Sequence, residues 1–437
     1  MRHTTQQRAR RRPVAFVLLA VTVCLLAVSA PALAASSAQP AAASPGATDA
    51  AAAADVASPA PADAASPAVA ASPIPSTLTC ALSKAAVVFG DPVTVSGQLD
   101  PAAEGQEVVI TIGGVEAGRD LTDATGAYEL TFTPQRSGDV VAQLAGDPSV
   151  VTAPQALSVK PKVGFSHGTL VPFLPSKVVV KVTPSAYDGV VVVKVVHRGV
   201  TVGTYRARVK DGRAVLQIPF RGVDGFTLNV TLPAAAGLAG RSFQAKVGIP
   251  AKTLSAGSSG PYVKGMLTGL RRLKFIVPGV GSTFSASVKD SVMAFQKAYR
   301  LSRTYVFNTA CWRKLDGARL IRPRYANPST HLEVDKTRQI LMVVKGGKPA
   351  GIICVSTGAT NNTPEGSFHI QQKHSFTTSG FGGILVRTMG FIGNFAIHGY
   401  APVPPYPASH GCIREPIWAC YWVFDHSFVG EALSIYH

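Results

Sequence analysis

Residues Ala396–Arg414 read AIHGYAPVPPYPASHGCIR, in which an apolar strand ends at His398 and a proline-rich loop leads to Cys412. Cys412 follows His398 by fourteen residues, so the loop can return the chain and bring the strand end beside the SHGC segment. A cysteine nucleophile needs a base within hydrogen-bond reach, a group that orients the base, and donors for the oxyanion. The stretch therefore predicts Cys412 as nucleophile and His398 as base.

The neighbouring residues supply the remaining requirements. The carbonyl of Gly399 can fix the tautomer of the base, since no acidic residue lies close to it in the sequence. The backbone amides of Gly411 and Cys412 form the predicted oxyanion hole, because a glycine lets the backbone approach a substrate closely. The positive neighbourhood of His410 and Arg414 is expected to lower the pKa of the Cys412 thiol.

Three ordered motifs, TPEGSF, IHGY and SHGCIR, resemble the L,D-transpeptidase catalytic domain of bacterial cell-wall enzymes. The resemblance covers about residues 329–437 and implies a mostly β, sandwich-like fold. It also implies that the cysteine attacks a tetrapeptide stem, D-alanine leaves, and the acyl group passes to a side-chain amine of another stem. Carried over residue by residue, it assigns Cys412 as nucleophile and His398 as base, with Gly399, Ser409, His410, Gly411 and Arg414 in support and Tyr400 at the substrate.

Two residues depart from the pattern of that family. Tyr400 stands in place of the small hydroxyl residue usual after the HG pair, and can narrow the donor pocket. Glu415 stands in place of the apolar residue usual after CIR, and an inward-pointing carboxylate would oppose thiolate formation at Cys412. A domain that has lost activity through these changes is one alternative.

The other cysteines and the histidines predict no second centre. Cys412 itself could be a small buried apolar residue, Cys354 is expected in the core, and Cys420 in the core or in a disulfide. A bridge between Cys412 and Cys420 would silence the thiol, and the pairing of Cys80 and Cys311 is left open. We expect no metal and no other cofactor, because no HExxH pattern or metal-ligand spacing occurs among His331, His369, His374, His426 and His437.

Residues 253–318 have helical periodicity. In PYVKGMLTGLRRLKF the apolar residues follow i, i+3, i+4, i+7 spacing, and two more helices are expected in FSASVKDSVMAFQKAYRL and NTACWRKL. The motifs GSSGPYVKGMLTGL, SVMAFQ and TACWRKL resemble a three-helix peptidoglycan-binding-like module. A three-helix spacer without a ligand is the alternative.

Residues 76–159 and 160–250 show short alternating strands separated by turn signals such as GD and GG. Two tandem all-β, immunoglobulin-like sandwiches are predicted, and such modules most often act as spacers.

The N-terminal segment predicts export. Residues 1–34 combine five arginines, an apolar run and the site Ala32-Leu33-Ala34, as in a secretory signal peptide, with an uncleaved membrane anchor as the alternative. Residues 35–75 are rich in Ala, Pro and Ser and are predicted to be a disordered tether. The net charge is +18 for the full chain and +13 without the five arginines of residues 1–34, which outside the cytoplasm favours an anionic cell-wall polymer over nucleic acid as partner.

The sequence therefore predicts an exported, cysteine-dependent L,D-transpeptidase that acts on peptidoglycan stem peptides, with glycan as a further candidate ligand. A carboxypeptidase that passes the acyl group to water and a non-catalytic wall-binding scaffold are the alternatives. The sequence predicts neither the acceptor nor the oligomeric state.

Overall fold

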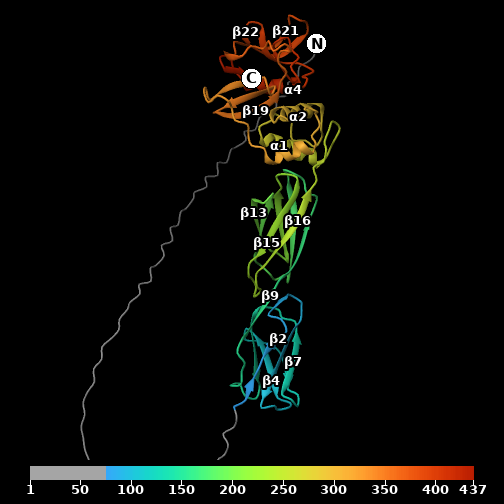
Figure 1. Ribbon diagram of the computed structural model, residues 1–437, viewed down its shortest axis with the longest axis vertical. Helices are drawn as coiled ribbons and strands as arrows, with labels where there is room; N and C mark the ends of the chain where they lie inside the picture. The colour runs from blue at the N-terminus through green and yellow to red at the C-terminus, as the bar shows by residue number, and fades with distance from the viewer. Residues whose placement is uncertain (1–74) are drawn as a thin grey trace, which may run out of the picture. The chain divides into compact units, whose positions relative to one another are not determined.

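The computed structural model describes residues 75–437. The predicted signal peptide, and the tether up to residue 74, lie outside the described residues. Along the chain, two β-rich parts are followed by three helices and a further β-rich part, coloured from blue to red in Figure 1. Among the helices of residues 75–437, none is both long enough and apolar enough to cross a bilayer.

The first β part consists of two sheets. One has the strand order β1-β4-β2 with β7 paired to β4, and the other has the order β3-β9-β8-β5-β6. The two-sheet composition is that expected of a sandwich, and the immunoglobulin-like assignment stays a prediction. The strands are β1 (Thr77–Leu78), β2 (Ala81–Leu82), β3 (Ala86–Val88), β4 (Val93–Asp100), β5 (Glu107–Ile112), β6 (Val115–Leu121), β7 (Ala127–Phe132), β8 (Gly138–Leu144) and β9 (Gln155–Lys160).

The second β part is also built from two antiparallel sheets. Their strand orders are β10-β11-β14 and β13-β12-β15-β16. Every second residue of β12 and β15 is buried, which is the alternation expected where one face of a sheet covers a core. The strands are β10 (Lys162–His167), β11 (Pro175–Thr183), β12 (Val190–His197), β13 (Val200–Arg208), β14 (Arg213–Pro219), β15 (Asp224–Leu232) and β16 (Arg241–Ile249).

Three helices lie in the three stretches of helical periodicity: α1 (Pro261–Arg272), α2 (Ala286–Ala298) and α3 (Thr309–Gly317). Pro261 opens α1, where its missing N–H costs no helical hydrogen bond. Ser285 and Asn308 cap α2 and α3, each accepting a backbone N–H of the first turn through its side chain. The assignment of these helices as a peptidoglycan-binding-like module stays a prediction.

The C-terminal part has two sheets, of order β19-β18-β17-β25-β20 and β21-β22-β23-β24, and helix α4 (Ile417–Asp425) packs against β22 and β23. The sequence ILMVVKGGKPAGIICVS, with the turn GGK between two apolar runs, predicts a hairpin, and the structure confirms it: Gly346 and Gly347 both have positive φ and turn the chain between β18 and β19. The strands are β17 (His331–Asp335), β18 (Ile340–Lys345), β19 (Lys348–Cys354), β20 (Gly366–His369), β21 (Gln372–Thr378), β22 (Ile384–Ile392), β23 (Phe395–Gly399), β24 (Ile413–Glu415) and β25 (Ala432–Tyr436).

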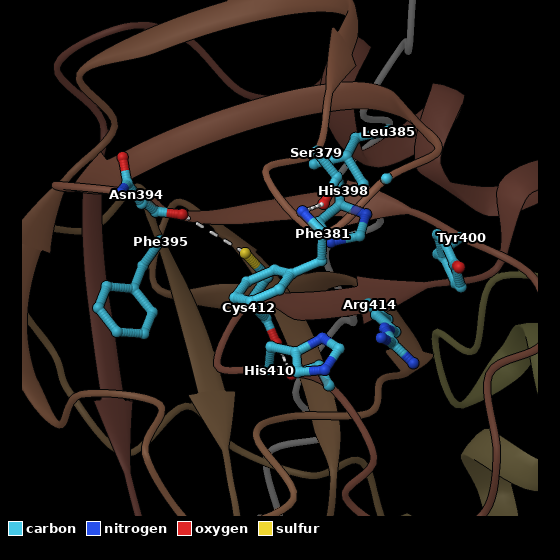
Figure 2. A pocket seen from close by; sticks show the side chains of 12 residues that line it. Ser379, Phe381, Leu385, Asn394, Phe395, His398, Tyr400, His410, Cys412 and Arg414 are labelled. Carbon is cyan, nitrogen blue, oxygen red and sulfur yellow. Dashed lines mark hydrogen bonds between the residues drawn. The ribbon is translucent and has the colours of Figure 1, made fainter.

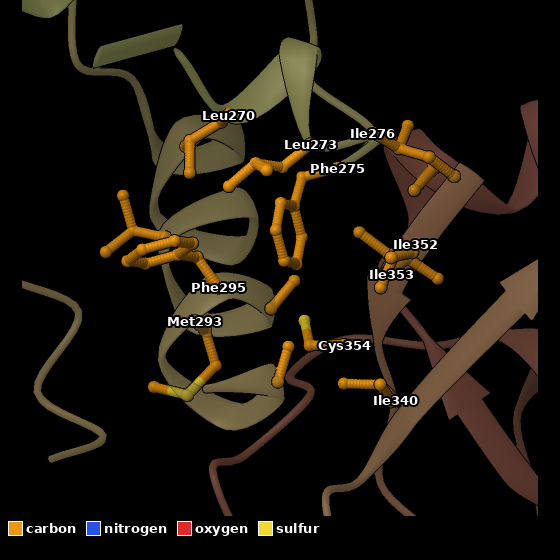
Figure 3. Close-up of a cluster of buried hydrophobic side chains, with 14 of the residues drawn as sticks. Leu270, Leu273, Phe275, Ile276, Met293, Phe295, Ile340, Ile352, Ile353 and Cys354 are labelled. Carbon is orange, nitrogen blue, oxygen red and sulfur yellow. The ribbon is translucent and has the colours of Figure 1, made fainter. Parts of the chain in front are cut away.

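The helices and the C-terminal sheets share one hydrophobic core. Side chains of α1 and α2, including Leu270 and Phe295, meet those of β18 and β19, including Ile352 (Figure 3). The segment after α1 also joins the backbone of β19, because Ile276 N donates to Ile352 O at 2.9 Å. Removing the helices would therefore expose apolar surface of the C-terminal part to water.

Candidate active site

The end of β23 and the start of β24 bring the predicted base and nucleophile together. These two strands pair in parallel, with Ile397 opposite Ile413 and His398 opposite Arg414. Cys412 immediately precedes β24, so its side chain and that of His398 reach the same cavity (Figure 2). The loop between them has thus returned the chain as the sequence predicts.

His398 is buried and oriented by the backbone. Its Nδ1 lies 3.3 Å from the carbonyl oxygen of Gly399, the partner expected from the sequence. Because a carbonyl only accepts, Nδ1 carries the hydrogen and Nε2 is the basic nitrogen. Burial, with a smaller contribution from Arg414, lowers the pKa of His398 to about 4, against the opposing effect of the Gly399 bond. His398 is therefore an uncharged base at neutral pH.

Cys412 is half-buried, and its Sγ lies 3.6 Å from the carbonyl oxygen of Asn394. Burial raises the pKa of the thiol above its ordinary value, and this effect outweighs the backbone of Ala396 and the charge of Arg414, which lower it. The charge of Arg414 thus lowers the thiol pKa as expected, but the expected net lowering is wrong because burial has the larger effect. At neutral pH the two side chains are therefore a thiol and a neutral imidazole.

The SHGC turn is fixed by hydrogen bonds on both sides. Ser409 Oγ accepts from Gly411 N at 3.0 Å and donates to the carbonyl oxygen of Cys412. Thr363, within the TPEGSF motif, donates to Gly411 O at 2.7 Å, and Asn362 donates to His410 O at 2.8 Å. The Gly411 amide, one of the two donors predicted for the oxyanion, is thus already bonded to Ser409.

Two glycines are required by close packing. Gly411 has φ of 131°, and a Cβ there would come within 2.5 Å of the Phe395 ring. A Cβ on Gly399 would come within 2.5 Å of Cys420 Sγ. Cys420 therefore packs against the backbone beside His398. It lies in the core, which is one of the two alternatives predicted for it; the other was a disulfide.

The cavity above Cys412 has a volume of about 320 Å³. On one side the ring of Phe381 stacks on His410 with 4.2 Å between centroids, and on the other the Arg414 guanidinium lies 4.6 Å from the centroid of the Tyr400 ring (Figure 2). Tyr400 and the predicted supporting residues Ser409, His410 and Arg414 all line it. Sequence reasoning missed six further lining residues, which come from segments without a motif: Ser379, Phe381, Gly382, Leu385, Asn394 and Phe395.

A second cavity, of about 400 Å³, also reaches Cys412. It lies along β21 and β22 and shares Phe381, Asn394 and Phe395 with the first cavity. His398, His410 and Arg414 are not among its lining residues, and its polar side chains besides Asn394 are those of Gln372, His374, Thr377, Thr378, Ser379 and Thr388. The thiol thus borders two overlapping cavities, of which only the first is lined by an arginine.

The L,D-transpeptidase catalytic-domain family (YkuD) matches residues 329–434. A solved L,D-transpeptidase from Xylanimonas cellulosilytica is similar, with 30% sequence identity over 43% of this chain and 99% of that chain and a TM-score of 0.41. This chain belongs to the L,D-transpeptidase family. Enzymes of this family are cysteine-dependent acyltransferases that act on peptidoglycan stem peptides.

Two further solved L,D-transpeptidases are more distant. The protein from Stackebrandtia nassauensis has 21% identity over 42% of this chain and 95% of its own, with a TM-score of 0.29. L,D-transpeptidase 1 of Mycobacterium tuberculosis has 20% identity over 24% of this chain and 61% of its own, with a TM-score of 0.21. No curated protein matches.

Among the described residues of this transpeptidase, all five cysteines are free, and no group of three or more potential ligands is arranged to hold a metal ion. Cys354 lies in the core, as predicted, where burial raises its pKa to about 12.

Glu415 is fully buried in the transpeptidase domain, and neither of its carboxylate oxygens has a hydrogen-bond partner among residues 75–437. Burial raises its pKa to about 8, because a charged carboxylate without a partner is disfavoured away from water. At neutral pH Glu415 is therefore protonated, and it places no negative charge beside Cys412.

Replacing Glu415 with glutamine is expected to change how stability depends on pH. An unfolded carboxyl ionises near pH 4.3, whereas the folded one ionises near pH 8. Between these values the unfolded chain releases a proton that the folded chain keeps, so the wild type loses stability as pH rises. The free energy of unfolding is measured with denaturant at pH 5 and at pH 8. Its decrease between these two values should be larger in the wild type than in Glu415→Gln by more than about 1 kcal/mol. Equal losses would contradict the burial of an unpaired carboxyl.

The neutral thiol–imidazole pair predicts a flat pH profile for acylation of this transpeptidase. His398 is available as a base above its pKa of about 4, and Cys412 stays a thiol throughout the neutral range. The acylation rate should vary by less than about threefold between pH 5.5 and 8 and fall in more acidic buffer. Single-turnover acylation measured across this range checks it; a tenfold rise per pH unit near neutrality would instead indicate that only the thiolate fraction reacts, without a base that accepts the thiol proton.

Proposed function

We propose that the chain is an exported L,D-transpeptidase that cross-links peptidoglycan stems through an acyl-enzyme on Cys412. The observation that carries the proposal is the meeting of two cavities at one half-buried thiol beside a neutral, backbone-oriented His398. Acyl transfer between two peptides needs a nucleophile that both peptides can reach and a base that can take up and return a proton.

In the first step, His398 Nε2 takes the proton of the Cys412 thiol as Sγ attacks the stem carbonyl. The Cys412 amide donates to the resulting oxyanion. When the C–N bond breaks, the imidazolium returns its proton to the leaving amine, and D-alanine departs. The product of this step is a thioester on Cys412, and His398 is again neutral.

In the second step, a side-chain amine of another stem attacks the thioester. His398 takes the proton of the amine and returns it to the departing sulfur, so the thiol is restored and an amide cross-link is formed. We assign the donor to the cavity with Arg414 and Tyr400, because the Arg414 cation suits a peptide carboxylate, and the acceptor to the polar cavity along β21 and β22.

The remaining parts of the chain fit an enzyme that works outside the cell. Residues 1–34 are proposed to direct export, residues 35–75 to act as a tether, and the two β-rich parts to act as immunoglobulin-like spacers. The net charge, +13 once the five arginines of residues 1–34 are removed, would concentrate the protein at anionic cell-wall polymers. We place the enzyme in the cell wall or at the outer face of the cytoplasmic membrane.

Product analysis distinguishes transfer from hydrolysis. The full chain is incubated with a purified disaccharide-tetrapeptide, and the products are identified by mass spectrometry. A cross-linked dimer with released D-alanine is the expected result. Tripeptide without dimer would establish a carboxypeptidase, and unchanged substrate would favour a non-catalytic wall-binding scaffold.

A further inference from the structure

The loop that joins His398 to Cys412 cannot hold itself by regular backbone pairing. Residues 401–408 read APVPPYPA, and the four prolines lack an N–H. Three successive carbonyls in this loop accept hydrogen bonds from side chains of the helical part of the chain. Tyr305 Oη bonds Val403 O at 3.3 Å, Lys297 Nζ bonds Pro404 O at 3.3 Å, and Arg303 Nη1 bonds Pro405 O at 2.6 Å.

Lys297, on α2, is the centre of this arrangement. Its side chain is fully buried and forms no ion pair within residues 75–437. Burying a cation is costly unless its N–H groups are bonded, and here they bond Pro404 O and, at 2.7 Å, Val355 O. Ser356, which follows Val355, forms two backbone hydrogen bonds of 2.9 Å with Arg414. One ammonium group therefore ties the loop to the strand that borders the nucleophile.

The turn that carries Arg303 and Tyr305 is itself held by the neighbour of Lys297. Gln296 Oε1 accepts from Thr304 N at 3.0 Å and from Tyr305 N at 3.1 Å, and its Nε2 donates to Val306 O at 2.9 Å. Tyr305 has φ of 61°, a conformation that costs free energy for a residue other than glycine and persists only when its surroundings fix it. The consecutive Gln296 and Lys297 thus hold the turn and the loop together.

We propose that Lys297, Arg303 and Tyr305 are positioning residues of the transpeptidase reaction, and that α2 and the turn after it are part of the catalytic apparatus. By holding residues 403–405, they set the position of Cys412 relative to His398. The inference rests on the proposed function, and it gives the helices a role distinct from binding the cell wall.

Lys297→Met in the full chain tests the inference, because methionine keeps the length and packing of the side chain and removes the donors. Lys264→Met, at an exposed lysine of α1, is the matched control. Displacement of the loop should lower kcat for cross-linking about 100-fold, with a smaller change in KM. The rate of alkylation of Cys412 by iodoacetamide, measured by peptide mapping, should fall at pH 7. The rate should also depend more steeply on pH, as for a thiol that no base assists. A folded Lys297→Met protein with wild-type kcat and alkylation rate would overturn the inference.

Arg303 provides a second test that does not depend on a buried residue, since its side chain is only half-buried. Arg303→Met should slow alkylation of Cys412, and Arg303→Lys, which keeps a donor, should restore most of the rate. If Lys297→Met does not fold, this pair decides: equal, wild-type rates in both variants would overturn the inference. If neither the wild type nor any variant cross-links the substrate, the proposed function is refuted. Slow alkylation of Cys412 in Arg303→Met would then still support the positioning role.

Discussion

Replacement of Cys412 with alanine is expected to abolish acyl transfer. The half-buried thiol is the proposed nucleophile and lines both cavities, the first of them together with His398, and loss of a nucleophile typically costs at least about 10⁴-fold in rate. Release of D-alanine and formation of cross-linked dimer should both fall to background. Substrate binding should persist, because the cavity walls other than the sulfur are unchanged.

Cys80→Ser is the matched control for this variant. Cys80 is also a half-buried free cysteine, but it lies in the first β part. This variant should retain wild-type rates of both reactions. Residual turnover by Cys412→Ala above a few per cent of the wild-type rate would show that another group carries the acyl chain.

Replacement of His398 with glutamine is expected to slow acylation by about 10² to 10⁴-fold. Glutamine approximates the shape of the ring but cannot accept the thiol proton, which the raised pKa of Cys412 keeps on sulfur at neutral pH. The remaining rate should rise with pH, because only the thiolate fraction then reacts. Single-turnover acylation across pH 6 to 9 measures both effects.

His410→Gln separates this effect from a general loss of a histidine in the cavity. His410 is exposed and stacks on Phe381, so its replacement should change the acylation rate by less than about tenfold. If the two histidine variants lost activity equally, the assignment of the base to His398 would be wrong.

The sequence predicted the pair Cys412 and His398 because both stand in compact motifs on one loop. It also located the three helices and the β18–β19 hairpin, where periodicity and turn glycines are strong local signals. The protonation states of Cys412 and His398 could not be predicted in the same way. His410 and Arg414 are visible in the sequence, but the burial that raises the pKa of the Cys412 thiol is a property of the fold.

The contacts that support the site come from distant parts of the chain. Thr363 and Asn362 hold the SHGC turn across 48 positions, and Lys297 reaches Pro404 across 107. Such pairs leave no periodic pattern in a single sequence. Glu415 illustrates the same limit: the residue was noticed, but only its complete burial shows that it is protonated and harmless to the thiol.

The acyl-enzyme itself provides the most direct test of the account. The full chain is mixed with the disaccharide-tetrapeptide, quenched in acid within one turnover, and analysed as intact protein and as peptides by mass spectrometry. The account predicts that the mass of the protein rises by that of the substrate minus D-alanine, and that the added group maps to Cys412. Substrate consumption with an unmodified Cys412, or with the acyl group on another residue, would contradict it.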